Sequence, residues 1–173
     1  MEFHGQYKFF FPESVAKRHG IPTELTIKNT VVAEGDENFL RAITRNEAMG
    51  LAGSPALFYV GLCNSASVAD SDVLTTLVTE PTVTFGYSRK SVERNSTGWP
   101  TIDTVNGQRR AASKVLTFTA SGGNFSAAFS RAFLCSVASG TGGLLFSVSG
   151  ALTVPVQLLD GESFQLQYEL YIR

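Results

Sequence analysis

The segment at positions 164–172 constrains the fold more than any other part of the sequence. Apolar and polar residues alternate there almost without a fault, in the order FQLQYELYI. Successive side chains of a β-strand point to opposite faces, so the even-numbered residues from Phe164 to Ile172 share one face. The polar residues at 165, 167 and 169 share the other face. This pattern predicts a strand in a sheet with one buried face and one face that meets water or a partner.

Shorter segments of strand-like composition fill most of the chain after residue 55, with turn signals between them. The dipeptide Asn106-Gly107 favours a two-residue hairpin turn. Residues 25–32 alternate weakly, and residues 74–80 are ambiguous. We expect strands at 56–63, 82–87, 88–93, 115–118, 125–137, 144–148, 152–156 and 164–172. The sequence therefore predicts a mainly β fold, an antiparallel β-sandwich or jelly-roll-like domain.

One short helix is expected near residues 36–45. Asp36 can accept hydrogen bonds from the free N–H groups at the start of such a helix. Phe39, Leu40 and Ile43 would then lie on one face. An earlier start, near Thr30, is left open.

The first 24 residues differ in character from residues 25–173, which we expect to form the β-sandwich domain. Pro12 and Pro22 interrupt this N-terminal segment. Aromatic residues crowd its first half: Phe3, Tyr7, Phe9, Phe10 and Phe11. One hypothesis is an extended arm that docks these rings on a neighbouring subunit. The other is an edge strand and loop folded onto the same domain.

The charge balance argues against two classes of partner. Lys and Arg total 14 and Asp and Glu total 15, so the chain lacks the basic surface that nucleic-acid binding requires. No stretch approaches the roughly 18 apolar residues of a membrane span. The N-terminus also lacks the basic start and apolar run of a signal peptide. We therefore expect a protein made in a cytoplasm that binds neither nucleic acid nor membrane.

Reactive residues are sparse and poorly placed for chemistry. The two histidines, His4 and His19, both fall in the N-terminal segment, and no zinc-site spacing or nucleophile-elbow motif is present. Asp70 and Asp72 could hold a calcium ion, but a solvated loop is favoured. We expect no enzyme activity, no cofactor and no bound metal.

The two cysteines, Cys63 and Cys135, lie far apart in the sequence and inside apolar runs. This placement favours two small buried side chains in a reducing compartment over a disulfide.

Three further residues are candidates for contact with a partner. Trp99 lies in a turn between Gly98 and Pro100, where it could stack on a sugar, anchor an interface or fold back over the end of the domain. Arg109 and Arg110 could bind a carboxylate of another subunit. The complete set of predicted interface residues is Phe3, Tyr7, Phe9, Phe10, Phe11, Trp99, Arg109 and Arg110.

Three blocks of sequence carry a resemblance to small structural proteins of tailed bacteriophages. They are NTVV at 29–32 with FYVGL at 58–62, LTTL at 74–77 with GYSRK at 86–90, and VLTFTA at 115–120 with LDGES at 159–163 and the terminal strand. The resemblance covers about residues 25–173 and leaves out the aromatic N-terminal segment. It implies a virion protein whose partners are other virion proteins, such as the major capsid protein or tail proteins. It also implies a symmetric homo-oligomer.

Four hypotheses follow from the sequence. The first is a capsid cement or decoration protein, and the second is a tail, collar or baseplate accessory protein. The third is a module that binds host glycans, with Trp99, Tyr87 and Tyr171 as stacking residues. The fourth, a glycan hydrolase, is disfavoured because no pair of carboxylates stands out.

Overall fold

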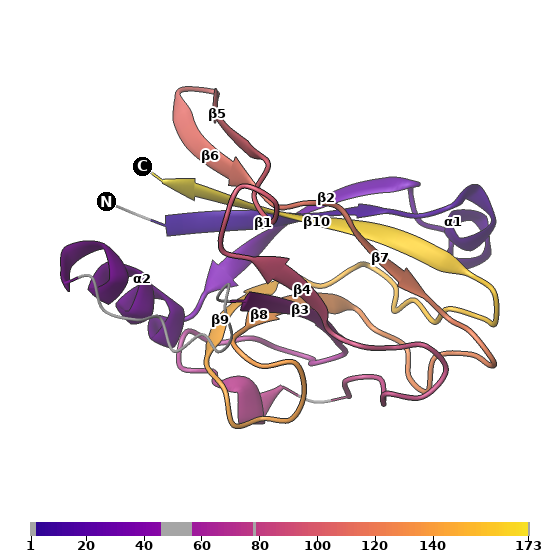
Figure 1. Ribbon diagram of the computed structural model, residues 1–173. Helices are drawn as coiled ribbons and strands as arrows, with labels where there is room; N and C mark the ends of the chain where they lie inside the picture. The colour runs from indigo at the N-terminus through magenta and orange to yellow at the C-terminus, as the bar shows by residue number, and fades with distance from the viewer. Residues whose placement is uncertain (1–2, 46–56, 78, 173) are drawn as a thin grey trace.

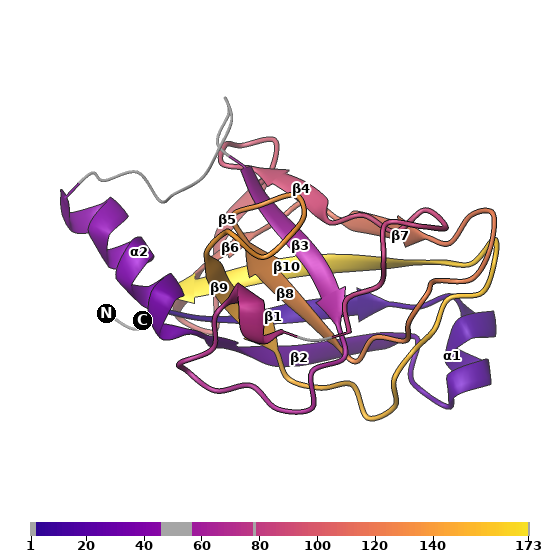
Figure 2. The ribbon, with the colours of Figure 1, turned by 90° about the horizontal axis from the view of Figure 1, so that it is seen from below.

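The computed structural model describes residues 3–45, 57–77 and 79–172, whose strands form one antiparallel sheet that curls into a half-barrel (Figures 1 and 2). The helices within this part of the chain are α1 (Glu13–His19), α2 (Ala33–Arg45) and a short 3₁₀ turn at Leu74–Thr76. The ten strands are β1 (Phe3–Phe10), β2 (Glu24–Val31), β3 (Leu57–Cys63), β4 (Lys90–Glu93), β5 (Thr101–Val105), β6 (Gln108–Ala112), β7 (Leu116–Thr119), β8 (Arg131–Cys135), β9 (Leu145–Ser149) and β10 (Ser163–Ile172).

The predicted mainly β, antiparallel fold is confirmed, whereas a sandwich or jelly roll is not. The strand order is β4-β3-β8-β9-β2-β1-β10-β6-β5, and β7 pairs with β10 beside β6. β2 makes the sheet continuous, because residues 24–28 pair with β1 while residues 29–31 pair with β9. β2 thus belongs to both halves of the sheet, and the sheet curls partly around the core.

The expectation of an extended N-terminal arm is wrong for residues 3–10. These residues form β1, which lies between β10 and β2 and pairs with β10 from Phe3↔Ile172 to Phe10↔Gln165. Tyr7 and Phe9 are fully buried and Phe11 nearly so. The physical reason is a period of two, since these rings alternate with Gln6, Lys8 and Phe10 as a half-buried strand requires. The segment folds onto the same domain, in the middle of the sheet and not at its edge.

The predicted helix near 36–45 is confirmed, with an earlier start. α2 begins at Ala33, so Asp36 lies inside the first turn and donates its backbone N–H to the Val32 carbonyl (3.0 Å). α2 packs closely on β9, where a Cβ on Gly35 would lie 2.2 Å from the carbonyl oxygen of Phe146. Glycine is therefore required at this position. The side chains of residues 40 and 43, which are predicted to share one face with Phe39, fall outside the described residues.

Helix α1 was not predicted, although its termini carry ordinary signals. Pro12 precedes the helix, Glu13 lies in its first turn, and Lys17, Arg18 and His19 lie in its last turn. Gly20 follows in the left-handed conformation (φ 65°). This order of proline, acid, base and glycine is typical of a short helix.

The predicted hairpin at Asn106-Gly107 is confirmed. Both residues have positive φ (51° and 78°), as a type I′ turn requires, and β5 pairs with β6 on either side. The β5–β6 hairpin projects from the body of the molecule (Figure 1). Ile102, on the terminal strand of the sheet, is 75% exposed.

Two predicted strands, at 82–87 and 152–156, do not form, and two others, at 88–93 and 125–137, are shorter than expected. Residues 82–87 contain a turn, in which Phe85 and Gly86 have φ of 55° and 83°, and the strand begins only at Lys90. The predicted strand at 125–137 is reduced to β8, preceded by an isolated bridge between Phe129 and Val156. In the segment at 82–87, the positive φ of Phe85 and Gly86 interrupts strand pairing.

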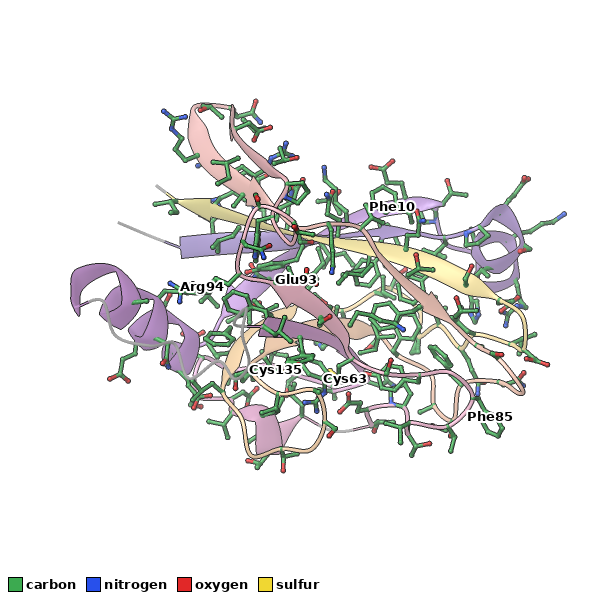
Figure 3. The ribbon with its side chains drawn as sticks, in the orientation of Figure 1. Phe10, Cys63, Phe85, Glu93, Arg94 and Cys135 are labelled. Atoms are coloured by element: carbon green, nitrogen blue, oxygen red, sulfur yellow. The ribbon has the colours of Figure 1, made fainter. Side chains whose placement is uncertain are left out.

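Stacked aromatic rings fill the concave side of the half-barrel (Figure 3). Phe164 lies at the centre, with ring centroids 5.0 Å from Phe129, 5.2 Å from Phe11 and 5.3 Å from Phe118. Cys63 and Cys135 are free thiols in a smaller cluster beside this core, and burial raises the pKa of both. The prediction of two buried cysteines without a disulfide is confirmed.

Candidate functional site

A groove of about 560 Å³ lies on the outer face of the sheet, the face of β1 and β10 that points away from the aromatic core. Its polar lining comes from four strands and the β5–β6 turn: His4, Gln6 and Lys8 from β1, Lys28 and Asn29 from β2, Asn106, Gln108 and Arg110 from the hairpin, and Tyr171 from β10. We refer to this feature as the outer groove.

Strand register explains why these residues meet. Gln6 of β1 lies opposite Glu169 of β10 on one side and Lys28 of β2 on the other. Two residues further along β10, Tyr171 lies opposite His4 of β1 on one side and Arg110 of β6 on the other. Directly opposed residues of an antiparallel sheet point to the same face, so two rows of polar side chains run across the outer face.

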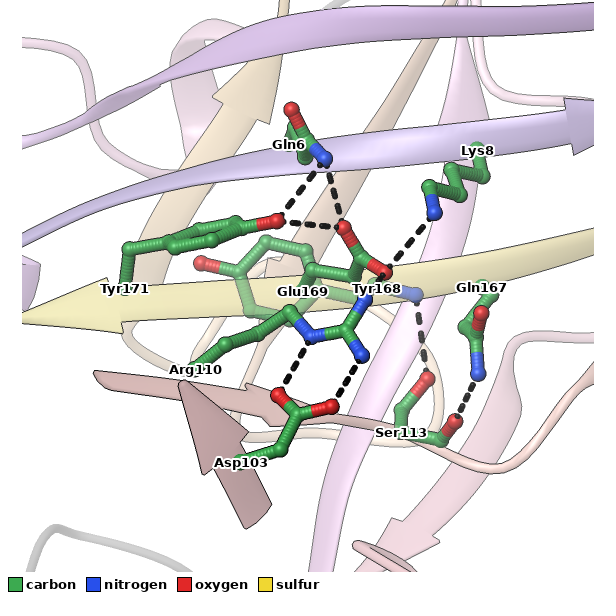
Figure 4. Close-up of polar contacts among 9 residues, drawn as sticks. All are labelled: Gln6, Lys8, Asp103, Arg110, Ser113, Gln167, Tyr168, Glu169 and Tyr171. Atoms are coloured by element: carbon green, nitrogen blue, oxygen red, sulfur yellow. Dashed lines mark hydrogen bonds and ion pairs between the residues drawn. The ribbon is translucent and has the colours of Figure 1, made fainter. Parts of the chain in front are cut away.

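Glu169 is the centre of this arrangement and lies beneath the groove side chains, with no exposed surface (Figure 4). Its carboxylate accepts hydrogen bonds from Gln6 Nε2 (2.5 Å) and the Tyr171 hydroxyl (2.9 Å). It also pairs with Lys8 Nζ (3.0 Å) and Arg110 Nη1 (2.6 Å). Four donors from three strands therefore saturate one buried carboxylate.

The pKa of Glu169 shows which of two opposing effects prevails. Burial acts to raise this pKa, but the hydrogen bonds from Gln6, Lys8 and Tyr171 outweigh it, and the pKa is lowered. The carboxylate is thus ionised at neutral pH. A group whose lone pairs are already filled by four donors is poorly suited to act as a general base.

Arg110 links the groove to the projecting hairpin. Its Nε and Nη2 atoms bind the two carboxylate oxygens of Asp103 at 2.9 and 2.6 Å, while Nη1 reaches Glu169. The Arg110 hydrogen bond lowers the pKa of Asp103. Asp103 and Arg110 face each other across β5 and β6, so this fork fixes the angle of the hairpin against β10.

A stacked pair of rings forms one wall of the outer groove. The rings of His4 and Tyr171 lie 5.4 Å apart at 13°. His4 Nε2 is 3.1 Å from Gln108 Oε1, which ties β1 to the hairpin. Burial, and then the hydrogen bond to Glu169, raises the pKa of Tyr171, so its hydroxyl keeps its proton at neutral pH.

Asn29 lies at the point where β2 leaves β1 for β9. Its Nδ2 donates to the Tyr168 hydroxyl (3.2 Å), whereas its buried Oδ1 has no hydrogen-bond partner within the described structure. A buried acceptor without a donor costs about 1–3 kcal/mol. This unsatisfied atom is therefore a local cost of the point where β2 leaves β1.

The loop with Asp70 and Asp72 does not form a metal site in the described structure. Asp72 Oδ2 accepts the backbone N–H of Ala69 (2.8 Å), and Asp70 lies near Asp36. Burial, and then the charge of Asp70, raises the pKa of Asp36. Across residues 3–45, 57–77 and 79–172, no three His, Cys, Asp or Glu side chains gather closely enough to hold an ion.

The predicted aromatic interface residues lie mostly in the core. Tyr7, Phe9 and Phe11 belong to the aromatic cluster and cannot dock on a neighbour. Phe10 points to the outer face, is half-buried, and lines a second groove of about 340 Å³ with Pro12. Phe3 begins β1, but its side chain falls outside the described residues.

Trp99 and the two arginines have three different environments. The Trp99 ring is half-buried against Phe58 and Tyr168, with centroids 6.1 and 6.0 Å away, so it folds back over the core. Arg110 binds two carboxylates of its own chain, and its predicted contact with another subunit stays a prediction. Arg109 is exposed on the opposite face of the hairpin.

Sequence reasoning missed the central residues of the groove. The alternation in residues 164–172 predicted that the outer face of β10 meets water or a partner, but it did not predict that Glu169 would be enclosed. The available signal was local, since Gln6 and Lys8 alternate with Tyr7 and Phe9. Recognising it required β1 to be placed beside β10.

Comparison with protein-family models gives no match for this chain, and a search of curated proteins finds no relative. Within the described residues, no helix has the length and apolar character needed to cross a membrane.

Proposed function

We propose that the chain is a structural component of a tailed bacteriophage virion that acts through contact with other virion proteins and not through catalysis. The sequence resemblance across residues 25–173 supports the class of protein. The observation that carries the proposal is the projecting β5–β6 hairpin, which ends in a strand with an exposed apolar residue.

The edge of β5 is suited to bind another chain. One side of its backbone pairs with β6, and the other side has no strand partner among the described residues. Ile102 is 75% exposed there, and the nearby charge of Asp103 is engaged by Arg110. Exposed edge strands of this kind accept a further strand or pack on a partner surface.

A second exposed apolar region lies away from the hairpin, in the turn at 82–86 (Figure 3). Val83 is 75% exposed and Phe85 44% exposed. Phe85 has a left-handed conformation (φ 55°), which is rare for a bulky residue and indicates a constrained functional position. The Ser121 N–H donates to the Phe85 carbonyl (3.0 Å) and holds the turn in place. Two separated contact regions suit a protein that bridges neighbours in an assembly.

Within this class we favour a capsid cement or decoration protein, with a tail, collar or baseplate accessory protein as the alternative. Copy counting by gel densitometry of purified particles separates them. A cement protein is present in numbers on the order of hundreds, set by the capsid lattice, whereas a tail component occurs in small multiples of the tail symmetry. Absence from purified particles would refute both.

The role of the hairpin is tested by Ile102→Lys. A charge on the edge of β5 is expected to block strand addition and reduce the amount of protein in particles. Val73→Lys is the control, because Val73 is also an exposed β-branched residue (38%, against 75% for Ile102) and lies outside the hairpin. Equal incorporation of both variants would refute the hairpin as the attachment site.

The glycan-binding hypothesis is not supported in its original form. Tyr87 is buried and bonded to the Leu62 N–H (2.9 Å), and Trp99 packs on the core. The buried Tyr87 ring is not accessible to a sugar, and the Trp99 ring is half-buried. Of the three proposed stacking residues, Tyr171 alone lines the outer groove.

A further inference from the structure

The outer groove carries more positive than negative charge. Lys8, Lys28 and Arg110 supply three cations, and Glu169 and Asp103 supply two carboxylates, which leaves one positive charge unmatched. Lys28 is the unmatched group, since it is exposed and forms no ion pair with any described residue. The groove therefore favours an anion at the β2 side.

The groove is also lined by primary amides, which simple anion sites do not need. Gln6, Asn29, Asn106 and Gln108 come from β1, β2 and the hairpin. An amide both donates and accepts hydrogen bonds, so several amides in one groove suit a ligand with several hydroxyl groups.

We propose that the outer groove binds an acidic sugar, a ring that carries hydroxyl groups and one carboxylate. The carboxylate lies at the ammonium groups of Lys28 and Lys8, and the hydroxyl groups meet the amides of Asn106 and Gln108. The volume of about 560 Å³ falls within the range of about 300–1,000 Å³ that is usual for small-molecule sites. Binding involves no reaction, because Glu169 is saturated.

This inference goes beyond the proposed virion role and does not depend on it. The contact regions proposed for the assembly are the free edge of β5 and the turn at 82–86, whereas the groove is lined by β1, β2, β6, β10 and the turn between β5 and β6. A protein that bound the sugar but failed to join particles would refute the assembly role alone.

Calorimetric titration of the purified chain with sodium glucuronate, glucose and sodium acetate tests the ligand class. Glucuronate is expected to bind about tenfold more tightly than either of the others, because it alone carries both hydroxyl groups and a carboxylate. Equal affinity for acetate would show an unspecific anion site, and equal affinity for glucose would show that charge has no role. Either result, or no binding of glucuronate, overturns the proposal.

Two substitutions locate the site. Lys28→Ala removes the unmatched cation, and Asn106→Gly removes an amide while glycine keeps the left-handed turn. Each is expected to weaken glucuronate binding about fivefold or more. Lys17→Ala, in α1 at the other end of β1, is the matched control and is expected to bind as the original chain does (Figure 1). Unchanged binding in Lys28→Ala would overturn the proposal, and thermal unfolding of each variant confirms that it is folded.

A titration with a glucuronate tetrasaccharide distinguishes a free sugar from a glycan chain. Equal binding of the monosaccharide and the tetrasaccharide would support recognition of a single ring. Tighter binding of the tetrasaccharide would support recognition of a chain, because further rings would then contact the protein beyond the first. Both results support the ligand class.

Discussion

Two buried charges, Glu169 and Arg131, are stabilised in contrasting ways. Glu169 is surrounded by side chains, two of them cations that reach the surface of the outer groove. Arg131 is surrounded by backbone, and its guanidinium donates to the carbonyls of Ser65 (2.7 Å), Ser149 (2.9 Å) and Ala66 (3.1 Å). No carboxylate pairs with it among the described residues.

The difference distinguishes a side-chain network that supports a surface groove, around Glu169, from a contact that holds the backbone in place, at Arg131. We call the second kind of contact a structural lock. Side-chain partners can be exchanged one at a time, so the surroundings of Glu169 can vary in charge and shape without disturbing the sheet. Carbonyl partners are fixed by the course of the chain, so Arg131 holds the loop after β3 against β9. We therefore expect substitutions at Arg131 to affect folding most and substitutions around Glu169 to affect the groove as well.

The largest effect is expected for Arg131→Met. The methionine fills part of the space but takes the arginine donor from the buried carbonyls of Ser65 and Ser149, each at a cost of about 1–3 kcal/mol, and from the partly buried carbonyl of Ala66. We expect a loss of about 3–5 kcal/mol in the free energy of unfolding, measured by urea denaturation at pH 7. Arg109→Met, at an exposed arginine, is the control and should change little. A loss below about 1 kcal/mol would contradict the role of a lock.

Glu169→Gln is expected to cost less, about 2 kcal/mol. The amide keeps the shape of the side chain and can still accept hydrogen bonds, but it no longer neutralises Lys8 and Arg110, which are partly exposed to water. Urea denaturation of the variant beside Asp160→Asn, an exposed carboxylate, measures the difference. Equal stability of the two variants would mean that the buried charge contributes nothing.

The contribution of Glu169 should also depend on pH in a defined direction. Its pKa is lowered in the folded protein, so its stabilisation is present above the ordinary value of 4.5 and is lost as the pH falls through the folded-state pKa. The stability advantage of the original chain over Glu169→Gln is therefore expected to shrink by more than about 1 kcal/mol between pH 6 and pH 3. Urea denaturation at several pH values measures it, and an advantage that grew on acidification would contradict the assignment.

The smallest effect is expected for Arg110→Lys, about 1 kcal/mol. Lysine keeps the charge but cannot bind Asp103 through two nitrogens and reach Glu169 as well. The exposure of Asp103 reduces the cost further through solvent screening. The adjacent Arg109→Lys, on the other face of the hairpin, is a matched control for thermal unfolding. If both variants melt alike, the fork does not stabilise the hairpin.

The parts of the fold that were predictable are those with local signals. The alternation of residues 164–172 predicts β10, and Asn106-Gly107 predicts the turn between β5 and β6. In both cases, neighbouring residues decide the conformation.

The groove was not predictable, because it depends on register between distant strands. Gln6 meets Glu169 only because β1 pairs with β10. The polar residues that alternate with the aromatic rings of residues 3–11 do not indicate which strand they will face. Similarly, nothing near Arg131 in the sequence indicates that carbonyls of Ser65 and Ser149 will surround it.

The pairing of β1 with β10 has a consequence for the nascent chain. β10 begins more than 150 residues after β1 ends, so until those residues have been made only one hydrogen-bonding edge of β1, the edge that faces β2, can be paired. Such non-local pairing is slow, and the folding intermediates expose apolar surface and unpaired strand edges that are prone to aggregate. We therefore expect chaperones to bind the chain until β10 has left the ribosome.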